Sequence, residues 1–281
     1  MDELIKDFVK RSLDEDVQTG DHTTIATIEK DAIGQAYLEA KESGVIAGID
    51  VVRDLFHAYD ESLEYEPLLE DGAHVEAGEV VFKVSGTYRS ILTMERTVLN
   101  TLQRMSAIAT ITNQYVKSIQ HTKAKILDTR KTTPGFRWFE KLAVRIGGGG
   151  NHRFGLYDMI LIKDNHIDAA GGIDQVLNRV DAYLKQNELS LDIEIETRSV
   201  SEVEQVIQNG KCDRIMLDNF TPSMTKEAVT LVGRRFELES SGGITLATVR
   251  DYAETGVDYI SVGALTHSIK AFDMSLKIKA N

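Results

Sequence analysis

From residue 125 onward, short apolar runs alternate with segments of helical periodicity. Six such runs recur at intervals of roughly 20 to 35 residues, which is the size of a strand followed by a covering helix. The runs are almost continuously apolar, as in strands that are buried on both faces of a parallel sheet. They are KILDTR (125–130), DMILIKD (158–164), LDIEIET (191–197), DRIMLDN (213–219), RFELESSGG (235–243) and DYISVGA (258–264).

Each run ends in polar residues or glycine, which is typical of a β/α barrel whose site lies at the carboxyl ends of its strands. A complete barrel needs eight such units, so six predict an incomplete, open β/α barrel. A doubly wound open sheet is the alternative, and it also places a ligand at the carboxyl ends of the strands. Covering helices are predicted over 199–211, with Gly210 as the stop, and over 245–256, beginning on a Thr cap and ending at Gly256.

The first hundred residues have a mixed pattern. Apolar residues at helical spacing predict helices over 2–14 and 91–119 and near 51–60. Strands are expected over 35–41 and 43–49, and the alternating apolar residues of 63–86 predict a small β layer with tight turns. We interpret GDHTT (20–24) as a turn with a helix N-cap, with direct ligand contact as the alternative.

These patterns predict two domains in an α/β protein. An N-terminal α/β, sandwich-like domain takes 1–107 and receives the C-terminal tail 268–281, and the open barrel takes 108–267.

Composition narrows the function classes. The chain has 281 residues and a net charge of −12, which argues against binding to nucleic acid or to anionic membranes. Its single cysteine, Cys212, excludes an intrachain disulfide and a cysteine metal cluster. We find no signal-peptide pattern and no apolar run of about 20 residues, so a cytoplasmic protein is expected.

Basic residues concentrate in one part of this acidic chain. Residues 123–166 contain nine Lys or Arg against four Asp or Glu. Arg130, Lys131 and Lys163 fall where predicted strands end, and His152 and Arg153 join them if the strands adjoin. Five such groups at one barrel mouth would repel each other unless an anion lies between them. The cluster therefore predicts a pocket for a small polyanion.

Two glycine-bearing turns follow the last two predicted strands. Backbone N–H groups at such turns bind phosphate in β/α barrels, because glycine permits close approach and a following helix favours negative charge. The alternative is that these glycines serve only packing or tight turns. The candidate residues are Ser241, Gly242, Gly243 and Gly263, with His267 nearby.

Two carboxylates, Glu196 and Asp218, end adjacent predicted strands. Glu194 lies on the same face as Glu196, and only a strand that faces a polar cavity tolerates two carboxylates in an apolar run. Carboxylates at neighbouring strand ends can share a hydrated Mg²⁺, or contact a ribose and a developing positive charge. The alternative is a purely structural hydrogen-bonding role.

Three segments carry a resemblance to a known family. DTRKTTPG (128–135), GGGGNHRFGLYD (147–158) and ILIKDNH (160–166) resemble the quinolinate phosphoribosyltransferases, and the similarity runs over nearly the whole chain. The chain departs from the family in having Gly150 where Val is common, and in its FRWFEK segment. Intact KDNH (163–166) favours this family over a related molybdenum-associated subfamily.

The resemblance implies an open barrel and a Mg²⁺-dependent homodimeric enzyme of NAD biosynthesis. It would convert quinolinate and phosphoribosyl pyrophosphate to nicotinate mononucleotide, CO₂ and pyrophosphate. Lys131, Glu196 and Asp218 would be catalytic, and the two acids would contact ribose or metal. The glycine turns would hold the 5-phosphate. The quinolinate carboxylates would be held by Arg130, His152, Arg153, Lys163 and, from the neighbouring subunit, Arg104. Without the resemblance, the sequence would assign Arg104 to a salt bridge or to the solvated surface.

Two other functions stay open from the sequence. One is a related phosphoribosyltransferase that acts on nicotinate or another acidic base, and the other is a non-catalytic anion-binding module. No side chain has the partners of a covalent nucleophile, since Cys212 has no paired histidine.

Overall fold

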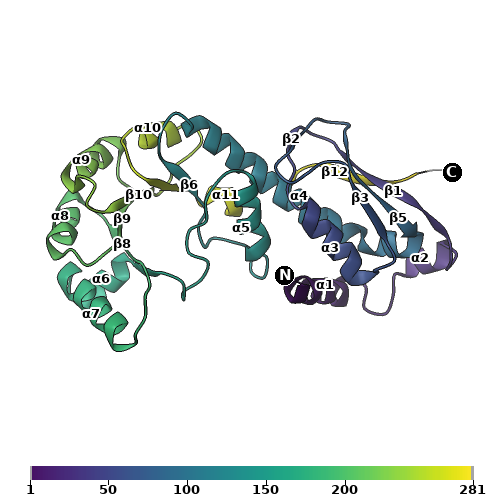
Figure 1. The fold of residues 1–281 in the computed structure, drawn as a ribbon, viewed down its shortest axis with the longest axis horizontal. Coiled ribbons are helices and arrows are strands. Elements are labelled where there is room, and N and C mark those ends of the chain that lie inside the picture. The colour runs from purple at the N-terminus through teal and green to yellow at the C-terminus, as the bar shows by residue number, and fades with distance from the viewer. Residues whose placement is uncertain (1, 280–281) are drawn as a thin grey trace. The chain divides into compact units, whose positions relative to one another are not determined.

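A computed structural model describes residues 2–279, which fall into two compact units (Figure 1). The first unit comprises Met1–Ile111, Trp138–Gly147 and Ile269–Asn281, and the second comprises Thr112–Arg137 and Gly148–Ser268. The chain passes from the first unit to the second within the long helix α4 (Tyr88–Ile119). In the described residues, no helix is both long enough and apolar enough to cross a membrane.

The first unit combines an antiparallel sheet with helices. Its four strands run in the order β12-β1-β5-β3, so the C-terminal strand pairs with the first strand of the chain. The strands are β1 (Ile33–Ala40), β3 (Glu64–Pro67), β5 (Val80–Thr87) and β12 (Met274–Ile278), with a separate pair β2 (Gly44–Val45) and β4 (His74–Val75). The buried rings of Phe56 and Phe82 meet edge to face in the core, 6.2 Å apart between centroids.

The helices of this unit follow the apolar pattern of the sequence with one addition. They are α1 (Asp2–Asp16), α2 (His22–Thr27), α3 (Ile49–Tyr59), most of α4 and nearly all of α5 (Arg137–Ile146). Asp21 is the expected N-cap, because its carboxylate accepts the N–H of Thr24. The short helix α2 follows this N-cap.

The second unit is an open β/α barrel. Its six parallel strands run in the order β6-β11-β10-β9-β8-β7. From β7 to β11 each strand pairs with the next strand of the chain, and β6 pairs with β11, so the ring is open between β6 and β7. In a doubly wound sheet, the strand order instead reverses at the centre. The strands are β6 (Lys125–Leu127), β7 (Ile160–Ile162), β8 (Ile193–Thr197), β9 (Arg214–Asp218), β10 (Glu237–Ser241) and β11 (Tyr259–Ser261).

Helices cover the outer side of these strands, as Figure 1 shows for α6 to α10. The helices of this unit are α6 (Asp164–Ala170), α7 (Ile173–Gln186), α8 (Val200–Asn209), α9 (Pro222–Val232), α10 (Val249–Ala253) and, at the cavity, α11 (Ala264–His267). The Gly210 stop of α8 is confirmed, and the Ser199 side chain caps the start of this helix. The predicted start of α10 at Thr245 is wrong, because Thr245–Thr248 form a turn in which Thr248 bonds back to Thr245.

Candidate active site

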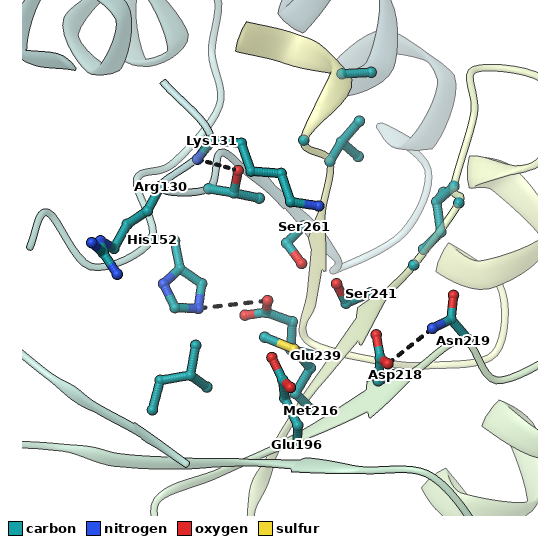
Figure 2. Close-up of a pocket in the computed structure, with 18 of the residues that line it drawn as sticks. Arg130, Lys131, His152, Glu196, Met216, Asp218, Asn219, Glu239, Ser241 and Ser261 are labelled. Atoms are coloured by element: carbon teal, nitrogen blue, oxygen red, sulfur yellow. Dashed lines mark hydrogen bonds and ion pairs between the residues drawn. The ribbon is translucent and has the colours of Figure 1, made fainter. Parts of the chain in front are cut away.

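A cavity of about 710 Å³ opens at the carboxyl ends of the six parallel strands, and it lies entirely within the second unit. Figure 2 shows side chains from several of these strand ends pointing into it. The cavity is lined by Arg130, Lys131, His152, Arg153, Lys163, Glu196, Asp218, Ser241, Gly242, Gly243, Gly263 and His267. Every predicted site residue except Arg104, which lies in the first unit, therefore borders one space.

The cationic side chains of the cavity have unused donors. Among the described residues, the buried Nε–H groups of Arg130 and Arg153 have no hydrogen-bond partner. Burial and the neighbouring charge of Arg130 both lower the pKa of the Arg153 guanidinium. Lys163 forms an ion pair with Glu196. A ligand with several negative charges would stabilise this arrangement of like charges and open donors.

The glycine turn after β10 requires glycine at one position above all. Gly242 has a φ of 99°, and a Cβ there would lie 2.2 Å from Oδ1 of Asn219 and 2.9 Å from its backbone nitrogen. Gly243 has a φ of 61° and faces open space. Because α10 begins only at Val249, the turn gains nothing from that helix dipole, contrary to the expectation from the sequence. Its backbone N–H groups remain suited to phosphate.

The second glycine, Gly263, lies between the side chains of two predicted site residues. A Cβ on Gly263 would lie 3.0 Å from the ring of His267 and 3.2 Å from Cδ of Lys131. The hydroxyl of Thr266 donates to the Lys131 carbonyl at 2.9 Å, which ties the loop after β6 to the short helix α11. Glycine at this point thus lets Lys131 and His267 approach the same part of the cavity.

Glu196 and Asp218 face the cavity from neighbouring strands, β8 and β9. Oε1 of Glu196 forms the ion pair with Lys163, and Oδ2 of Asp218 accepts a hydrogen bond from the Asn219 side chain at 2.9 Å. Both residues are half-buried. Carboxylate oxygens, water and substrate phosphates are the ligands that Mg²⁺ prefers. This pair therefore fits a magnesium ion.

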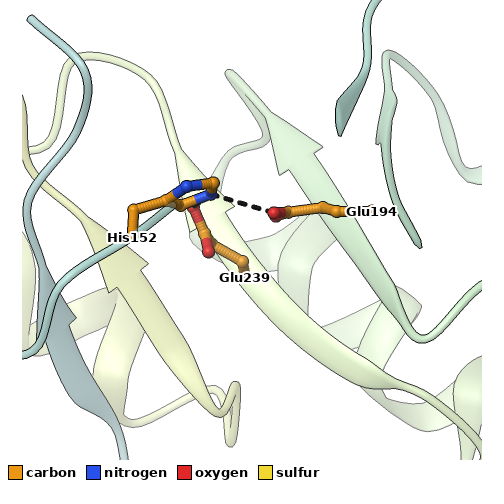
Figure 3. Close-up of side chains that lie close together, drawn as sticks. All are labelled: His152, Glu194 and Glu239. Atoms are coloured by element: carbon orange, nitrogen blue, oxygen red, sulfur yellow. Dashed lines mark ion pairs between the residues drawn. The ribbon is translucent and has the colours of Figure 1, made fainter. Parts of the chain in front are cut away.

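A second group of titratable side chains, His152, Glu194 and Glu239, is buried next to the cavity (Figure 3). Nε2 of His152 lies 2.9 Å from Oε2 of Glu194 and 3.7 Å from Oε1 of Glu239. Burial raises the pKa of both carboxyls to about 7, and the charge of Glu194 adds to the effect on Glu239. Arg214 opposes both shifts and contacts Glu239 at 3.2 Å.

These three residues have ligand atoms close enough for a metal ion, but the histidine has the wrong tautomer. Nδ1 of His152 accepts the backbone N–H of Arg153 at 2.8 Å, so a neutral ring carries its proton on Nε2. A metal-bound histidine instead donates its second ring nitrogen and coordinates with the first. The group is therefore a buried cluster of ion-pair contacts.

Comparison with known proteins finds one family over nearly the whole chain. The family model for the quinolinate phosphoribosyl transferase C-terminal domain matches residues 108–277, and the N-terminal domain model matches residues 21–106. The chain belongs to the quinolinate phosphoribosyltransferase family.

Relatives within this family are similar in both sequence and fold. A tobacco protein named quinolinate phosphoribosyltransferase [decarboxylating] 1b is 47% identical over 98% of this chain and 82% of its own length. A probable nicotinate-nucleotide pyrophosphorylase [carboxylating] from Bacillus subtilis is 40% identical over 94% and 90%. The structure of the nicotinate-nucleotide pyrophosphorylase from Francisella tularensis has a TM-score of 0.92 and 40% identity, covering 99% and 97%.

Glu239 borders the cavity of this quinolinate phosphoribosyltransferase but was not among the residues predicted from the sequence. It is fully buried, borders the cavity and faces His152. A signal existed, since a lone glutamate interrupts the apolar strand RFELESS and lies on the strand face that side-chain alternation assigns to the barrel interior.

Proposed function

We propose that the chain transfers the phosphoribosyl group of phosphoribosyl pyrophosphate to quinolinate, with loss of CO₂, to give nicotinate mononucleotide and pyrophosphate. The observation that carries this proposal is that one cavity combines the cationic side chains Arg130, Arg153 and Lys163 with the glycine turn at Gly242. Both substrates are polyanions, so such a cavity suits the pair. The names of the relatives describe the same chemistry.

The two carboxylates of quinolinate fit the basic side of the cavity. The planar guanidinium groups of Arg130 and Arg153 suit a carboxylate, and their buried Nε–H donors are available to it. Lys163 supplies a third charge. Because Glu196 already pairs with Lys163, quinolinate binding would loosen that pair and release Glu196 toward the ribose.

A fourth cation comes, in this proposal, from Arg104 of a second copy of the chain in a homodimer. In the structure, Nε and Nη2 of Arg104 lie 2.6 Å from Oε1 of Glu140, whose side chain is fully buried. A guanidinium that is fixed by a buried carboxylate keeps one direction, which suits a residue that has to reach a neighbouring site.

Phosphoribosyl pyrophosphate fits the opposite side of the cavity. The turn at Gly242 and Gly243 and the backbone at Gly263 would bind the 5-phosphate, with His267 beside it. Lys131 would contact the pyrophosphate. Glu196 and Asp218 would hold a Mg²⁺ ion, directly or through water, and such an ion neutralises the charge of the pyrophosphate leaving group.

In the reaction, the ring nitrogen of quinolinate forms a bond to C1 of the ribose while the bond from C1 to pyrophosphate breaks. Positive charge develops on the ribose, where the carboxylates of Glu196 and Asp218 stabilise it. The product ring then carries a positive charge, which stabilises the electron pair left at C2 when CO₂ departs. A proton from water completes nicotinate mononucleotide.

The test is a turnover assay of the purified chain with quinolinate, phosphoribosyl pyrophosphate and Mg²⁺, in which nicotinate mononucleotide and CO₂ are followed together. We expect both products in equal amounts, and loss of turnover on chelation that Mg²⁺ reverses. Lys163→Ala should reduce turnover, whereas Lys226→Ala, an exposed residue of α9, should not.

The same assay separates the two other functions that the sequence left open. Nicotinate is run in parallel, and turnover of nicotinate without turnover of quinolinate would replace the proposed substrate while keeping the phosphate site. No turnover of either substrate would favour an anion-binding module. Location in the cytoplasm stays a prediction.

A further inference from the structure

The opening of the barrel between β6 and β7 is bordered on both sides by contacts of residues 150–153, which we call the bridging segment. Gly150 forms a parallel bridge with β6, and its N–H donates to a carbonyl of that strand at 2.7 Å. A Cβ on Gly150 would lie 2.8 Å from Cδ2 of Leu127, so the backbone lies directly against the strand. At the other end, Nη1 of Arg153 donates to the carbonyl of Met159, which directly precedes β7, at 3.1 Å. The segment therefore connects the two strands that border the opening.

Two of the proposed quinolinate-binding side chains, those of His152 and Arg153, extend from this segment and line the cavity. Apart from the bridge at Gly150, the bridging segment lies outside the helices and strands. Binding groups on a loop are placed less precisely than groups on a strand, and a displacement of about 1 Å is enough to weaken binding and turnover. The segment therefore needs a further contact that fixes its backbone.

Asp128 supplies this contact from the end of β6. It is fully buried, and both oxygens of its carboxylate bind the bridging segment. Oδ1 accepts the backbone N–H of His152 at 2.8 Å, and Oδ2 accepts a hydrogen bond from Nδ2 of Asn151 at 2.7 Å. The backbone N–H of Asp128 also donates to the Gly150 carbonyl at 3.2 Å. Hydrogen bonds to an ionised carboxylate are stronger than those between neutral groups, so Asp128 is the main attachment of the segment to β6.

We propose that Asp128 is a positioning residue for quinolinate. Its carboxylate fixes the bridging segment, and the segment directs the His152 ring and the Arg153 guanidinium toward the substrate carboxylates. The effect extends to Arg153 because its N–H donates to Nδ1 of His152 at 2.8 Å. The identity of the ligand rests on the proposed function, whereas the contacts of Asp128 belong to the protein alone.

Steady-state kinetics of two variants at this position test the proposal. Asp128→Ala removes both acceptor oxygens, so kcat/KM for quinolinate should fall roughly tenfold to hundredfold, while KM for phosphoribosyl pyrophosphate stays within about threefold. Asp128→Asn keeps an oxygen for the His152 N–H and an amide that pairs with the amide of Asn151, so it should restore most of the loss.

Asp258→Ala is the matched control at the opposite end of the sheet. Asp258 directly precedes β11, and its carboxylate also accepts one backbone N–H, that of Leu238 at 3.0 Å, and one side-chain donor, Nζ of Lys123 at 2.7 Å. The substitution removes the same kinds of contact away from the bridging segment. It should lower stability but leave kcat/KM for quinolinate within about threefold.

Amide hydrogen exchange of the ligand-free protein provides a measurement that does not depend on turnover. The N–H of His152 should exchange roughly tenfold faster in Asp128→Ala than in the unaltered protein, because it loses its acceptor. Asp258→Ala should leave this rate within about threefold.

The outcomes separate a positioning role from a purely structural one. An unchanged kcat/KM for quinolinate in Asp128→Ala, equal losses for the two substrates, or the same selective loss in Asp258→Ala would overturn the proposal. If Asp128→Ala does not fold, Asn151→Ala removes one of the two contacts from an exposed residue, and a selective loss of about threefold to tenfold is then expected, with no loss counting against the role. If the unaltered protein turns over no quinolinate, the proposed function fails, while hydrogen exchange still tests whether Asp128 fixes the segment.

Discussion

Arg153 is the residue whose role depends most directly on which substrate occupies the cavity. Its guanidinium suits a carboxylate, and its Nε–H is a buried donor with no partner among residues 2–279. We expect Arg153→Ala to raise the KM for quinolinate about tenfold to hundredfold, which corresponds to the loss of a charge-assisted hydrogen bond. KM for phosphoribosyl pyrophosphate should change by less than about threefold. Equal losses for both substrates would show that the role is misassigned.

Glu239 makes the stability of the protein depend on pH. Burial raises its pKa from 4.5 to about 7, so between these values the folded state keeps a proton that the unfolded state has released. Stability is therefore lost as pH rises through this range, by at most roughly 1.4 kcal/mol per pH unit. Glu239→Gln should remove the effect.

Urea denaturation at several pH values measures this difference. Relative to the unaltered protein, Glu239→Gln should gain stability from pH 4.5 to about 7 and then level off. Glu237→Gln on the same strand is the control, since its side chain is half exposed. A constant difference between the Glu239→Gln variant and the unaltered protein would mean that Glu239 titrates normally.

These two residues also show what a sequence can and cannot predict at this scale. Arg153 was predicted because cationic residues concentrate around it in an acidic chain, and composition reports such concentrations directly. The pairing of Glu239 with His152 was not predicted, because 87 positions of chain separate them, from 152 to 239, and only the closing of the sheet brings them together.

Among the connecting elements, the turn after β10 gives the most specific prediction, which concerns the substitution Gly242→Ala. In Gly242→Ala the new Cβ would meet Asn219, and its φ of 99° is unfavourable for alanine. We expect a loss of about 1 to 3 kcal/mol in unfolding free energy and a rise of roughly tenfold in KM for phosphoribosyl pyrophosphate.

Gly210→Ala is the matched control for this turn. Gly210 ends α8 with a φ of 76°, and nothing lies within 4 Å of its missing Cβ. The alanine variant should lose about 1 kcal/mol through backbone strain alone and keep its KM values. A similar KM rise in both variants would mean that global destabilisation, and not the phosphate turn, causes the effect.

Elements with strong periodicity were predicted well, and those without it were not. The six strands and helix α8 are where the apolar pattern places them, because burial on both faces of a parallel sheet leaves long apolar runs. The start of α10 was misplaced. Thr245 has a side chain that suits an N-cap, but here it lies in a turn in which the Thr248 hydroxyl accepts the backbone N–H of Thr245. The residue type alone does not distinguish a turn from a helix start.

At the scale of the whole molecule, the number of predicted strands indicated which fold the second unit has. Six strands and not eight indicated an open barrel, and the order β6-β11-β10-β9-β8-β7 confirms it. The proposed homodimer has no comparable signal in one sequence, because interface residues need not differ in composition from the rest of the surface. Arg104 illustrates this, since in its own chain it forms an ordinary ion pair with Glu140.

Complementation between two defective chains tests whether Arg104 acts across subunits. Arg104→Lys loses the planar fork but keeps a cation beside the buried Glu140, so the fold should survive. It is co-expressed with Lys163→Ala under a second tag, and the mixed dimer is purified through both tags. If Arg104 acts in trans, one of the two sites combines an intact cavity with an intact Arg104, and the mixed dimer should have about half of the normal activity.

The control is a mixed dimer of Lys163→Ala with Arg153→Ala. Both lesions lie in the same cavity, so neither site of that dimer is intact and its activity should stay at the level of the parent variants. If the mixed dimer of Arg104→Lys and Lys163→Ala has only this low activity, Arg104 acts within its own chain. Recovery in that dimer alone would instead mean that each active site requires two copies of the chain, which would link activity to the subunit concentration.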